Sequence, residues 1–386
     1  MTGWSNWAGN VSCGPALVAE PRSREELAAL LVRTAGRGGN VRVAGSGHSF
    51  TPIVATDDVL LSMAGFSGIQ STDREACRAT VRAGTRIADL GAPLQAAGLA
   101  LANQGDVDVQ AMAGAISTGT HGTGPALGSL STMVGGVTLA TASGEIVDID
   151  EGDPEALAAS ALSLGTLGVV VAVTLNLVPA YRLRERVWRE PVEQALGRLP
   201  ELIARTRHFE FFWLPESDEA DCKALHPALP DAVPGDTERI DWSWRIFPSE
   251  RTRKFVESEW SVPAERGPAC FSAIRELMRT RHSEVKWPVE YRTVAADRLP
   301  LSPAFGRATV AISIHQGADR PWQAFFAEAQ EIFVAHDGRP HWGKWHSLRR
   351  ADFLGLYPNW LSFERVRQRF DPGGLFLSPY LSNIFE

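Results

Sequence analysis

The chain has 386 residues, which is enough for two domains with separate hydrophobic cores. Its 22% of charged and 44% of hydrophobic residues are typical of a globular protein, and the net charge of −7 argues against a nucleic-acid partner. The four cysteines are scattered without a Cys-x-x-Cys pair, so we expect neither a disulfide framework nor a metal site.

The N-terminus and the apolar segments carry no pattern typical of export or membrane insertion. Residues 1–6 contain neither a basic stretch nor an apolar one. The most apolar run, over 167–178, is about half as long as a bilayer span. We therefore expect a cytoplasmic protein with no membrane partner.

Helix and strand patterns alternate in the first third of the chain. A capping box over 23–26, followed by leucines at helical spacing, predicts a helix that ends at the glycines of 36–39. A short buried strand over 40–44 leads into the loop 45–50. The pattern further predicts a strand over 79–84, a helix capped by Thr85, a hairpin formed by 137–141 and 145–149, a helix that begins at Asp153 and Pro154, and a strand over 171–177.

Two segments rich in glycine and other small residues are the strongest functional signals in this part. The first is the loop 45–50, which contains His48, and the second is the run 114–124, which contains His121. The first loop has neither the third glycine of a dinucleotide fingerprint nor the Gly-Lys-Ser/Thr ending of a P-loop. Because glycine lets the main chain turn tightly and approach an anion, two such loops suit a ligand with two phosphates and a flat ring.

The composition changes after Pro179, with more tryptophan and arginine and longer polar connections. Long antiparallel strands with helices on one face predict an α+β cap in this region. The expected strands cover 209–214, 240–247 and 255–262, and the expected amphipathic helices cover 271–280 and 322–335.

Six segments occur in a set order along the chain: 6–10, 45–50, 119–124, 165–170, 290–297 and 341–344. In this combination the chain resembles the FAD-dependent sugar-lactone and alditol oxidases of the vanillyl-alcohol-oxidase superfamily, most weakly between 180 and 285. The resemblance implies an α+β fold with a vanillyl-alcohol-oxidase/PCMH-type FAD-binding domain over 1–178. An antiparallel-sheet cap domain for the substrate would follow over 179–340, and 341–386 would return to the FAD-binding domain.

The resemblance also implies a cofactor and its contacts. We expect FAD, bonded covalently to His48 through the 8α-methyl group of the ring. His121 and its neighbouring glycines would lie along the pyrophosphate and ribityl chain. The expected cofactor-binding residues are Arg42, Gly45, Ser46, Gly47, His48, Ser49, Asn103, Gly105, Asp106, Gly114, Ser117, Thr118, Gly119, His121, Gly122, Gly168, Val169 and Val170.

The candidates for substrate chemistry begin with two predicted strands. Glu290 and Arg292 are two residues apart, so both side chains leave one face of their strand, and the apolar residues that follow predict a buried pair. In the strand 308–316, Ser313 and His315 share a face that we expect toward the substrate. The alditol oxidases carry histidine and threonine at these two positions, so either His315 or Glu290 is the expected base.

Three further residues complete the expected site. Lys344, between two tryptophans, is the candidate for the cation near the flavin N1 and C2 carbonyl, where it would stabilise negative charge. Gly105 and Asp106 match the pair that the family places over the flavin near C4a. Alditol oxidases carry alanine and serine there, so glycine would leave room for oxygen, and Asp106 would accept a substrate hydroxyl.

The resemblance implies oxidation of an aldonolactone of the L-gulono- or D-arabinono-1,4-lactone type, with hydride transfer to the flavin N5. The expected partners are a small sugar lactone or polyol and O2, which would be converted to H2O2. The alternatives are an alditol oxidase acting on xylitol or sorbitol, a lactone dehydrogenase with another acceptor, and a flavin-binding protein without turnover. Charged residues beside the reactive edge argue against the last of these.

Overall fold

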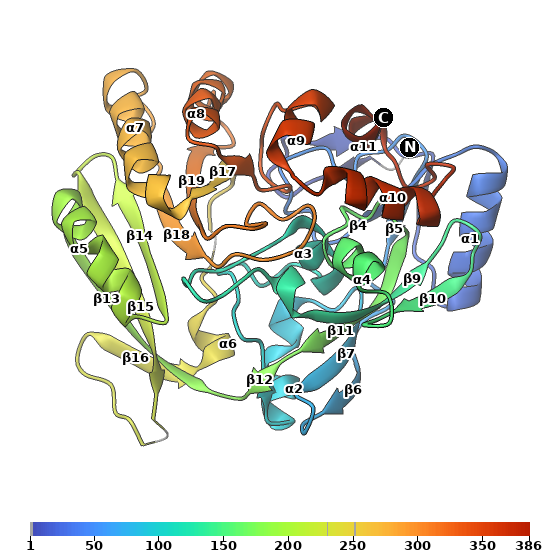
Figure 1. Ribbon diagram of the computed structural model, residues 1–386, viewed down its shortest axis with the longest axis horizontal. Coiled ribbons are helices and arrows are strands. Elements are labelled where there is room, and N and C mark those ends of the chain that lie inside the picture. The colour runs from blue at the N-terminus through green and yellow to red at the C-terminus, as the bar shows by residue number, and fades with distance from the viewer. Residues whose placement is uncertain (1–2, 230, 251) are drawn as a thin grey trace.

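The computed structural model describes residues 3–229, 231–250 and 252–386. Two parts lie side by side in Figure 1. The first part holds the elements of residues 3–179 together with the C-terminal helices, and the second part is built on one large sheet. None of the helices in the described ranges is long and apolar enough to cross a membrane.

The first part contains short strands and four helices before residue 180. Its strands are β1 (Trp4–Ser5), β2 (Ser12–Cys13), β3 (Leu17–Ala19), β4 (Val41–Ala44), β5 (Val59–Ser62), β6 (Ile69–Asp73), β7 (Arg78–Arg82), β8 (Leu99–Ala100), β9 (Val134–Ala140), β10 (Ile146–Ile149), β11 (Val169–Asn176) and β12 (Val178–Pro179). Its helices are α1 (Arg24–Gly36), α2 (Gly91–Ala96), α3 (Met112–Thr118) and α4 (Pro154–Ala161).

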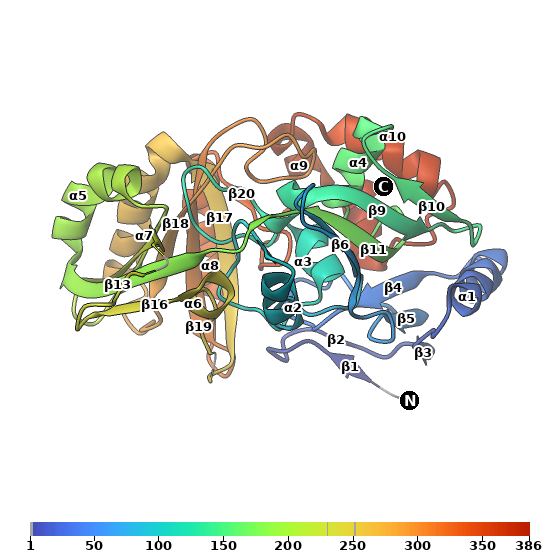
Figure 2. The same ribbon diagram turned by 90° about the horizontal axis from the view of Figure 1, so that it is seen from below.

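Two sheets organise this part. Strands β3, β5 and β4 form a parallel sheet in that order, and β10, β9, β11, β7 and β6 form an antiparallel one. Helix α3, beside β11 in Figure 2, contacts that strand of the antiparallel sheet. The hydrophobic core around them is completed by aromatic residues of the C-terminal tail, among them Trp342, Phe353, Trp360 and Phe385.

The second part is an eight-stranded sheet in the order β16, β13, β15, β14, β18, β19, β17, β20. The strands are β13 (Arg182–Pro191), β14 (His208–Leu214), β15 (Glu219–Ala228), β16 (Glu238–Trp242), β17 (Phe255–Pro263), β18 (Val289–Val294), β19 (Thr309–Gly317) and β20 (Arg339–Pro340). The helices are α5 (Val192–Arg205), α6 (Ser243–Ile246), α7 (Gly267–Thr280) and α8 (Gln323–Ala335).

Alternation along these strands separates an apolar face from a charged one. The apolar face packs under α5, α7 and α8, which stand at the opposite end of the molecule from α1 (Figures 1 and 2). Its residues include Phe209, Phe211, Trp213, Val256, Trp260, Tyr291, Ile312 and Ile314. The residues between them, such as Glu257, Glu259, Glu290 and Arg292, therefore point to the other face.

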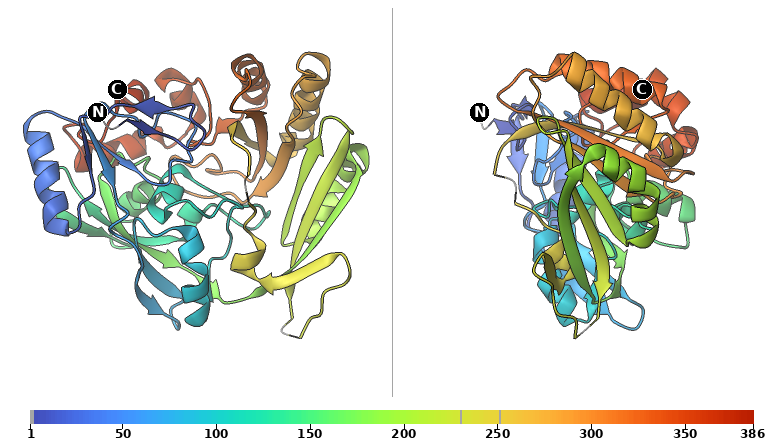
Figure 3. Two further views of the ribbon diagram at one scale, coloured as in Figure 1. Left: turned by 180° about the vertical axis from the view of Figure 1, so that it is seen from behind. Right: turned by 90° about the vertical axis from the view of Figure 1, so that its left-hand side faces the viewer.

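The chain returns to the first part after β20. Helices α9 (Arg350–Leu356), α10 (Trp360–Phe370) and α11 (Pro379–Phe385), red in Figures 1 and 3, belong to the first part, where α10 contacts α4. The backbone N–H of Val41 in β4 donates to the carbonyl oxygen of Leu375 at 2.8 Å, which ties the tail to the strand before the first glycine loop.

Most of the predicted elements are confirmed. Ser23 caps α1 by accepting from the N–H of Glu26, Asp153 caps α4, and β9 and β10 form the predicted hairpin with Gly144 at φ +80°. The α+β architecture with an antiparallel sheet in the second part is also as predicted.

Three predicted elements are wrong in part. The helix after Thr85 is a 3₁₀ turn followed by the six-residue α2, because Gly91 and Pro93 interrupt the pattern, and the Thr85 hydroxyl instead bonds the carbonyl of Arg82. The predicted strand 240–247 stops at β16, since Trp244 turns away to pack on Gly91. Residues 114–118, expected in a loop, belong to α3, whose small residues pack into the core.

Candidate active site

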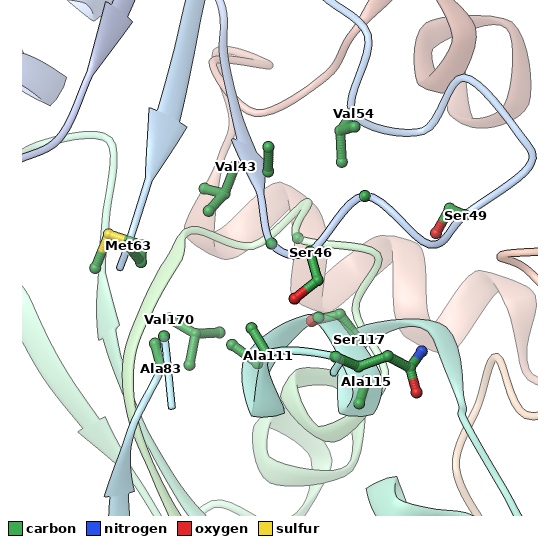
Figure 4. A pocket seen from close by; sticks show the side chains of 18 of the residues that line it. Val43, Ser46, Ser49, Val54, Met63, Ala83, Ala111, Ala115, Ser117 and Val170 are labelled. Atoms are coloured by element: carbon green, nitrogen blue, oxygen red, sulfur yellow. The ribbon is translucent and has the colours of Figure 1, made fainter. Parts of the chain in front are cut away.

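The larger of two adjoining cavities lies in the first part of the molecule. It encloses about 1270 Å³ and is lined by the loop after β4, by α3 and by the start of β11. In Figure 4, Ser46 from the first loop faces Ala111 and Ser117 across the cavity, with Val170 on another side.

Glycines are required at this cavity for two different reasons. A side chain at Gly114 would project into open space, so its absence leaves room for a ligand. Gly47 has φ +71° and Gly165 has φ +66°, conformations that L side chains rarely adopt. The cavity is therefore shaped by backbone and small side chains, which lets an extended ligand lie close to the main chain.

Arg42 lines the same cavity, but its guanidinium is bound to the protein. It donates to the backbone carbonyls of Ile53, Leu164, Gly165 and Phe376. Burial lowers the pKa of Arg42 to about 10. These bonds connect the segment after β4, the residues just before β11 and the C-terminal tail.

His48 stands at the junction of the two cavities. Its ring stacks on Trp7, with centroids 5.2 Å apart and an angle of 22° between the planes. Burial and the nearby positive charge of Lys344 lower the pKa of His48 to about 4. The imidazole is therefore neutral at physiological pH, with a nitrogen lone pair available.

The second cavity encloses about 770 Å³ between the two parts of the molecule. It shares His48, Ser49, Gln110 and Thr118 with the first cavity, so the two cavities adjoin at the first glycine loop. The charged face of the large sheet forms its other wall, with Glu257, Glu259, Glu290, Arg292 and His315.

Arg292 lies at the centre of this charged face. Its guanidinium contacts the carboxylate of Glu259 and lies 3.3 Å from Oε2 of Glu290. Burial raises the pKa of Glu290 to about 7, and nearby carboxylates add to the effect, although Arg292 opposes it. Glu290 therefore exchanges a proton near neutral pH.

Glu259 is bound by three side chains at once. Its carboxylate contacts Arg292, accepts from the Ser313 hydroxyl at 2.7 Å and lies 3.0 Å from Nε2 of His121. Burial alone would raise the pKa of Glu259, but the charges of His121 and Arg292 outweigh it and hold that pKa well below its usual range. It is a permanent anion that orients its neighbours.

Glu257 forms a second group with Lys344 and His315. Lys344 Nζ contacts its carboxylate, and Nε2 of His315 lies 3.7 Å from Oε1. Nδ1 of His315 lies 2.9 Å from the carbonyl oxygen of Pro288, which favours the tautomer with the proton on Nδ1. Lys344 therefore enters the cavity with a carboxylate partner, and Nε2 of His315 faces the same carboxylate.

Donor atoms of Glu257, Glu290 and His315 lie within 4.8 Å of one another. Lys344 contacts one of these carboxylates and Arg292 lies beside the other. The two cations already compensate the negative charge, so this arrangement is described by ion pairing without a metal.

Gly105 and Asp106 lie at the cavity wall opposite the sheet. A Cβ at Gly105 would come within 3.0 Å of the carbonyl oxygen of His121, so close packing as well as ligand space requires glycine there. Asp106 also lines the cavity, and its Oδ2 is 3.3 Å from the Ser249 hydroxyl.

The structure brings most of the expected site residues to the two cavities. Four of the expected cofactor residues, Asn103, Gly119, Gly122 and Val169, lie outside the two cavities as the described residues enclose them. Gly119 has φ +77° and ends α3, and a Cβ at Gly122 would come within 2.3 Å of the carbonyl oxygen of Gln104. These two glycines shape the backbone behind the ligand.

Sequence reasoning missed Glu257, Glu259, Trp7 and His341 as site residues. Glu257 and Glu259 alternate with Val256, Ser258 and Trp260 in β17, which overlaps the predicted strand 255–262. Two carboxylates on one face of a buried strand would have indicated a functional role from the sequence alone. His341 lies behind His121, with centroids 5.9 Å apart, and burial lowers its pKa to about 3. Only the folded tail brings it there.

Comparison with known proteins identifies the chain. The family model for D-arabinono-1,4-lactone oxidase matches residues 173–234 and 228–384, and that for an FAD binding domain matches 15–150. An L-gulono-1,4-lactone dehydrogenase from Mycobacterium tuberculosis is 34% identical, over 99% of this chain and 98% of that protein. An L-gulonolactone oxidase from Scyliorhinus torazame is 31% identical, over 99% and 98%.

A solved structure of a cholesterol oxidase from B. sterolicum superposes on 100% of this chain and 96% of its own with a TM-score of 0.88. At 17% identity this likeness concerns the fold, and it confirms the vanillyl-alcohol-oxidase type. Fold and site together define an FAD-dependent oxidoreductase. Within that class the chain belongs to the D-arabinono-1,4-lactone oxidase family.

Proposed function

We propose that this enzyme oxidises a sugar lactone of the L-gulono-1,4-lactone type at the hydroxyl-bearing carbon next to the lactone carbonyl. The observation that carries the proposal is the junction of the two cavities. One is long and glycine-lined, the other is charged, and they meet at His48. We assign FAD to the first cavity and a small polyhydroxylated substrate to the second.

The two hydrophobic cores support a division into domains with the predicted boundaries. Residues 1–178 and 341–386 would form the FAD-binding domain, and 179–340 the substrate domain. Trp342, Phe353 and Trp360 pack in the first core, and residues from Val192 to Phe333 form most of the second. The substrate cavity then lies where the domains meet, a common place for active sites.

Covalent attachment of FAD to His48 is the expected linkage. The ring nitrogen must be unprotonated to form a bond to the 8α-carbon, and the lowered pKa of His48 satisfies this condition. Trp7 holds the ring at the junction of the cavities, where the edge of a flavin would lie. When bound, FAD supplies the two-electron acceptor, taking hydride from the substrate carbon at N5.

Arg292 and Glu290 are proposed to bind and deprotonate the reacting hydroxyl. The guanidinium, held by Glu259, donates to the substrate oxygen and stabilises negative charge as it develops. Glu290 accepts the hydroxyl proton, since a base with pKa about 7 is ionised in part at neutral pH. Nε2 of His315 is the alternative acceptor on the same wall.

Lys344 is proposed to place positive charge beside the flavin pyrimidine, with Glu257 fixing its position. Its ammonium also lies 5.2 Å from the centre of the Phe50 ring, on the side of the first glycine loop. Asp106 lines the charged cavity and is proposed to contact a remaining substrate hydroxyl. Ser313 lies outside the cavity lining and donates to Glu259, which lines it, so the predicted substrate role of Ser313 would act through that carboxylate. These contacts would distinguish a lactone from an open-chain polyol.

We propose O2 as the electron acceptor, because Gly105 lines the substrate cavity without a side chain. One similar protein is named a dehydrogenase and another an oxidase, so the acceptor needs its own test. Air-saturated enzyme supplied with lactone should release H2O2 in step with lactone oxidised. Turnover only with an added dye would make the protein a dehydrogenase.

A panel of lactones and alditols tests the substrate proposal. L-gulono-1,4-lactone and its stereoisomers should give higher kcat/KM than xylitol or sorbitol under the same conditions. A higher value for an alditol would favour the alditol oxidase alternative. A flavin-loaded protein that oxidises none of them would contradict both.

A further inference from the structure

A third, smaller cavity lies behind Arg292, on the side away from the first glycine loop. It encloses about 330 Å³, less than half the volume of the substrate cavity. Arg292 and Asp106 line both, so they form the wall between them. We call this space the rear chamber. Its other polar lining residues are Gln104, Thr123, His208, Glu210 and Lys223.

Two polar groups at the rear chamber have no hydrogen-bond partner among the described residues. Both ring nitrogens of His208 are unpartnered, although the residue is only 1% exposed. Nε of Arg292 is also buried and unpartnered, while its NH2 group contacts Glu259. Buried polar atoms without partners are rare because each costs free energy, so a ligand between these two groups is the natural explanation.

The strand register places the two groups on neighbouring strands. His208 and Glu210 are two residues apart and lie on the same face of β14, and Glu210 is the register partner of Arg292 in β18. Phe247 packs against the His208 ring at 5.2 Å between centroids and closes one side of the chamber. Lys223 is already paired with Glu210 at 3.1 Å, so these two charges of the chamber wall compensate each other.

We propose that the rear chamber is a hydroxyl-binding subsite, in which one O–H group bridges His208 and Nε of Arg292. Through this bridge His208 acts as a positioning residue for Arg292, which binds the substrate. An O–H group suits the site because it accepts from the arginine N–H and donates to an imidazole nitrogen. The group belongs either to a bound water or to the hydroxyl of the substrate that is farthest from the oxidised carbon. The proposed role of Arg292 in lactone oxidation underlies this inference.

The chemistry of His208 fits a neutral partner. Burial, helped by the positive charges of Arg207 and Lys223, lowers the pKa of His208 to about 3. A neutral imidazole offers one N–H and one lone pair, and a glutamine side chain offers the same two functions. His208→Gln is therefore the conservative variant, and His208→Phe removes both functions while keeping a ring against Phe247.

Kinetics of three variants test the proposal. His208→Phe should raise KM or lower the flavin-reduction rate by about fivefold or more, the effect of one lost buried hydrogen bond, and His208→Gln should recover most of it. Arg292 lowers the pKa of Glu290. If the Arg292 side chain is less firmly positioned in His208→Phe, the acid limb of kcat/KM should therefore move to higher pH in this variant. Leu225→Val, which enlarges the chamber without changing its polar atoms, is the control and should leave the pH profile unchanged.

Two lactones with the same ring and reacting carbon, one lacking the terminal hydroxymethyl group, distinguish the two sources. If the substrate supplies the O–H group, His208→Phe affects only the longer lactone. If water supplies it, both lactones are affected equally. An equal response of His208→Phe and Leu225→Val, in folded protein with normal FAD content, would overturn the proposal.

A high-resolution crystal structure of the wild-type holoenzyme gives a readout that does not depend on turnover. We expect an ordered oxygen atom within hydrogen-bond distance of both Arg292 Nε and a His208 nitrogen. A chamber that stays empty in crystals both without and with a soaked-in lactone would contradict the subsite. Failure to oxidise either lactone would instead count against the proposed function and leave this crystallographic test in place.

Discussion

Glu259 connects the most side chains within the charged cluster. Arg292 lies on one oxygen together with the Ser313 hydroxyl, and His121 lies on the other. Both carboxylate oxygens are therefore engaged by protein groups, and Glu259 acts through these neighbours. Its charge is also what keeps the Arg292 guanidinium compensated in a buried setting.

Glu259→Gln should lower the rate of flavin reduction by about 10²-fold, because the arginine that binds the developing oxyanion loses its fixed partner. Ser313→Ala removes one neutral hydrogen bond and should lower the rate of flavin reduction by only about tenfold. Rapid-mixing measurements of flavin reduction, at equal FAD content, compare the two. Near-normal reduction in Glu259→Gln would show that Arg292 does not depend on this carboxylate.

The pH dependence of kcat/KM should carry an acid limb centred near pH 7. Below that pH Glu290 is protonated and cannot accept the hydroxyl proton, and above it the carboxylate is ionised and active. Glu290→Gln should lower the plateau and abolish the limb. A limb that persists in Glu290→Gln but disappears in His315→Gln would assign the base to His315.

At the scale of elements, the flavin cavity depends on glycines whose neighbours are backbone atoms. A Cβ at Gly122 would meet the carbonyl oxygen of Gln104 at 2.3 Å, and only a main-chain shift relieves this contact. Gly14, by contrast, has open space around the position of a Cβ. The two positions form a matched pair for the same substitution.

Gly122→Ala should destabilise the protein by about 1–3 kcal/mol, the usual cost of forcing an extra carbon into packed surroundings, and should lower FAD content. Gly14→Ala should leave both unchanged. Thermal unfolding and the flavin-to-protein absorbance ratio measure the two effects. Equal behaviour of the two variants would show that the segment after α3 adapts freely.

Covalent attachment is a property of the first glycine loop and can be tested separately. Wild-type protein should keep its flavin through acid precipitation and show a fluorescent band on a denaturing gel. His48→Ala should fold with FAD bound but release it on unfolding, since the loop backbone and Gly114 still shape the cavity. Flavin that washes out of denatured wild-type protein would disprove the linkage.

The elements themselves were largely readable from the sequence, and the exceptions have local causes. Strands β14, β17, β18 and β19 follow from alternation, and α1 and α4 follow from their caps. The strand 240–247 was overestimated because a tryptophan contact with α2, distant in sequence, ends it early. Helix α3 was missed because its small residues look like loop until they pack in a core.

The candidate site was predicted in its chemistry but not in its connectivity. Glu290, Arg292 and Lys344 were found by type and spacing, and the structure places them on one cavity. The pairing of Lys344 with Glu257, and of Arg292 with Glu259, joins residues at least 33 positions apart. No local pattern specifies such partners, because the order of strands in the sheet brings them together.

At the scale of the whole molecule, the C-terminal tail follows the second part in sequence and completes the first core. Trp342, Phe353, Trp360 and Phe385 are all buried there, and Trp342 Nε1 donates to the carbonyl of Leu301. The chain therefore passes between the two parts of the molecule twice, once before β13 and once after β20.

A chain ending at residue 340 should fail to fold stably, because it removes these aromatic residues from the core, and losing even one such side chain typically costs about 3–5 kcal/mol. Limited proteolysis and flavin binding of the truncated protein check this outcome. Retention of FAD by the truncated protein would show that residues 1–178 form a self-sufficient domain.

The central claim is that the charged cavity presents a sugar lactone to FAD. Anaerobic mixing of the FAD-loaded enzyme with L-gulono-1,4-lactone, followed by the visible absorbance of the flavin, tests it most directly. We predict rapid bleaching, at least tenfold slower in Arg292→Ala, and slower bleaching with xylitol than with the lactone. Flavin that stays oxidised with every aldonolactone, or is reduced faster by xylitol, would contradict the account.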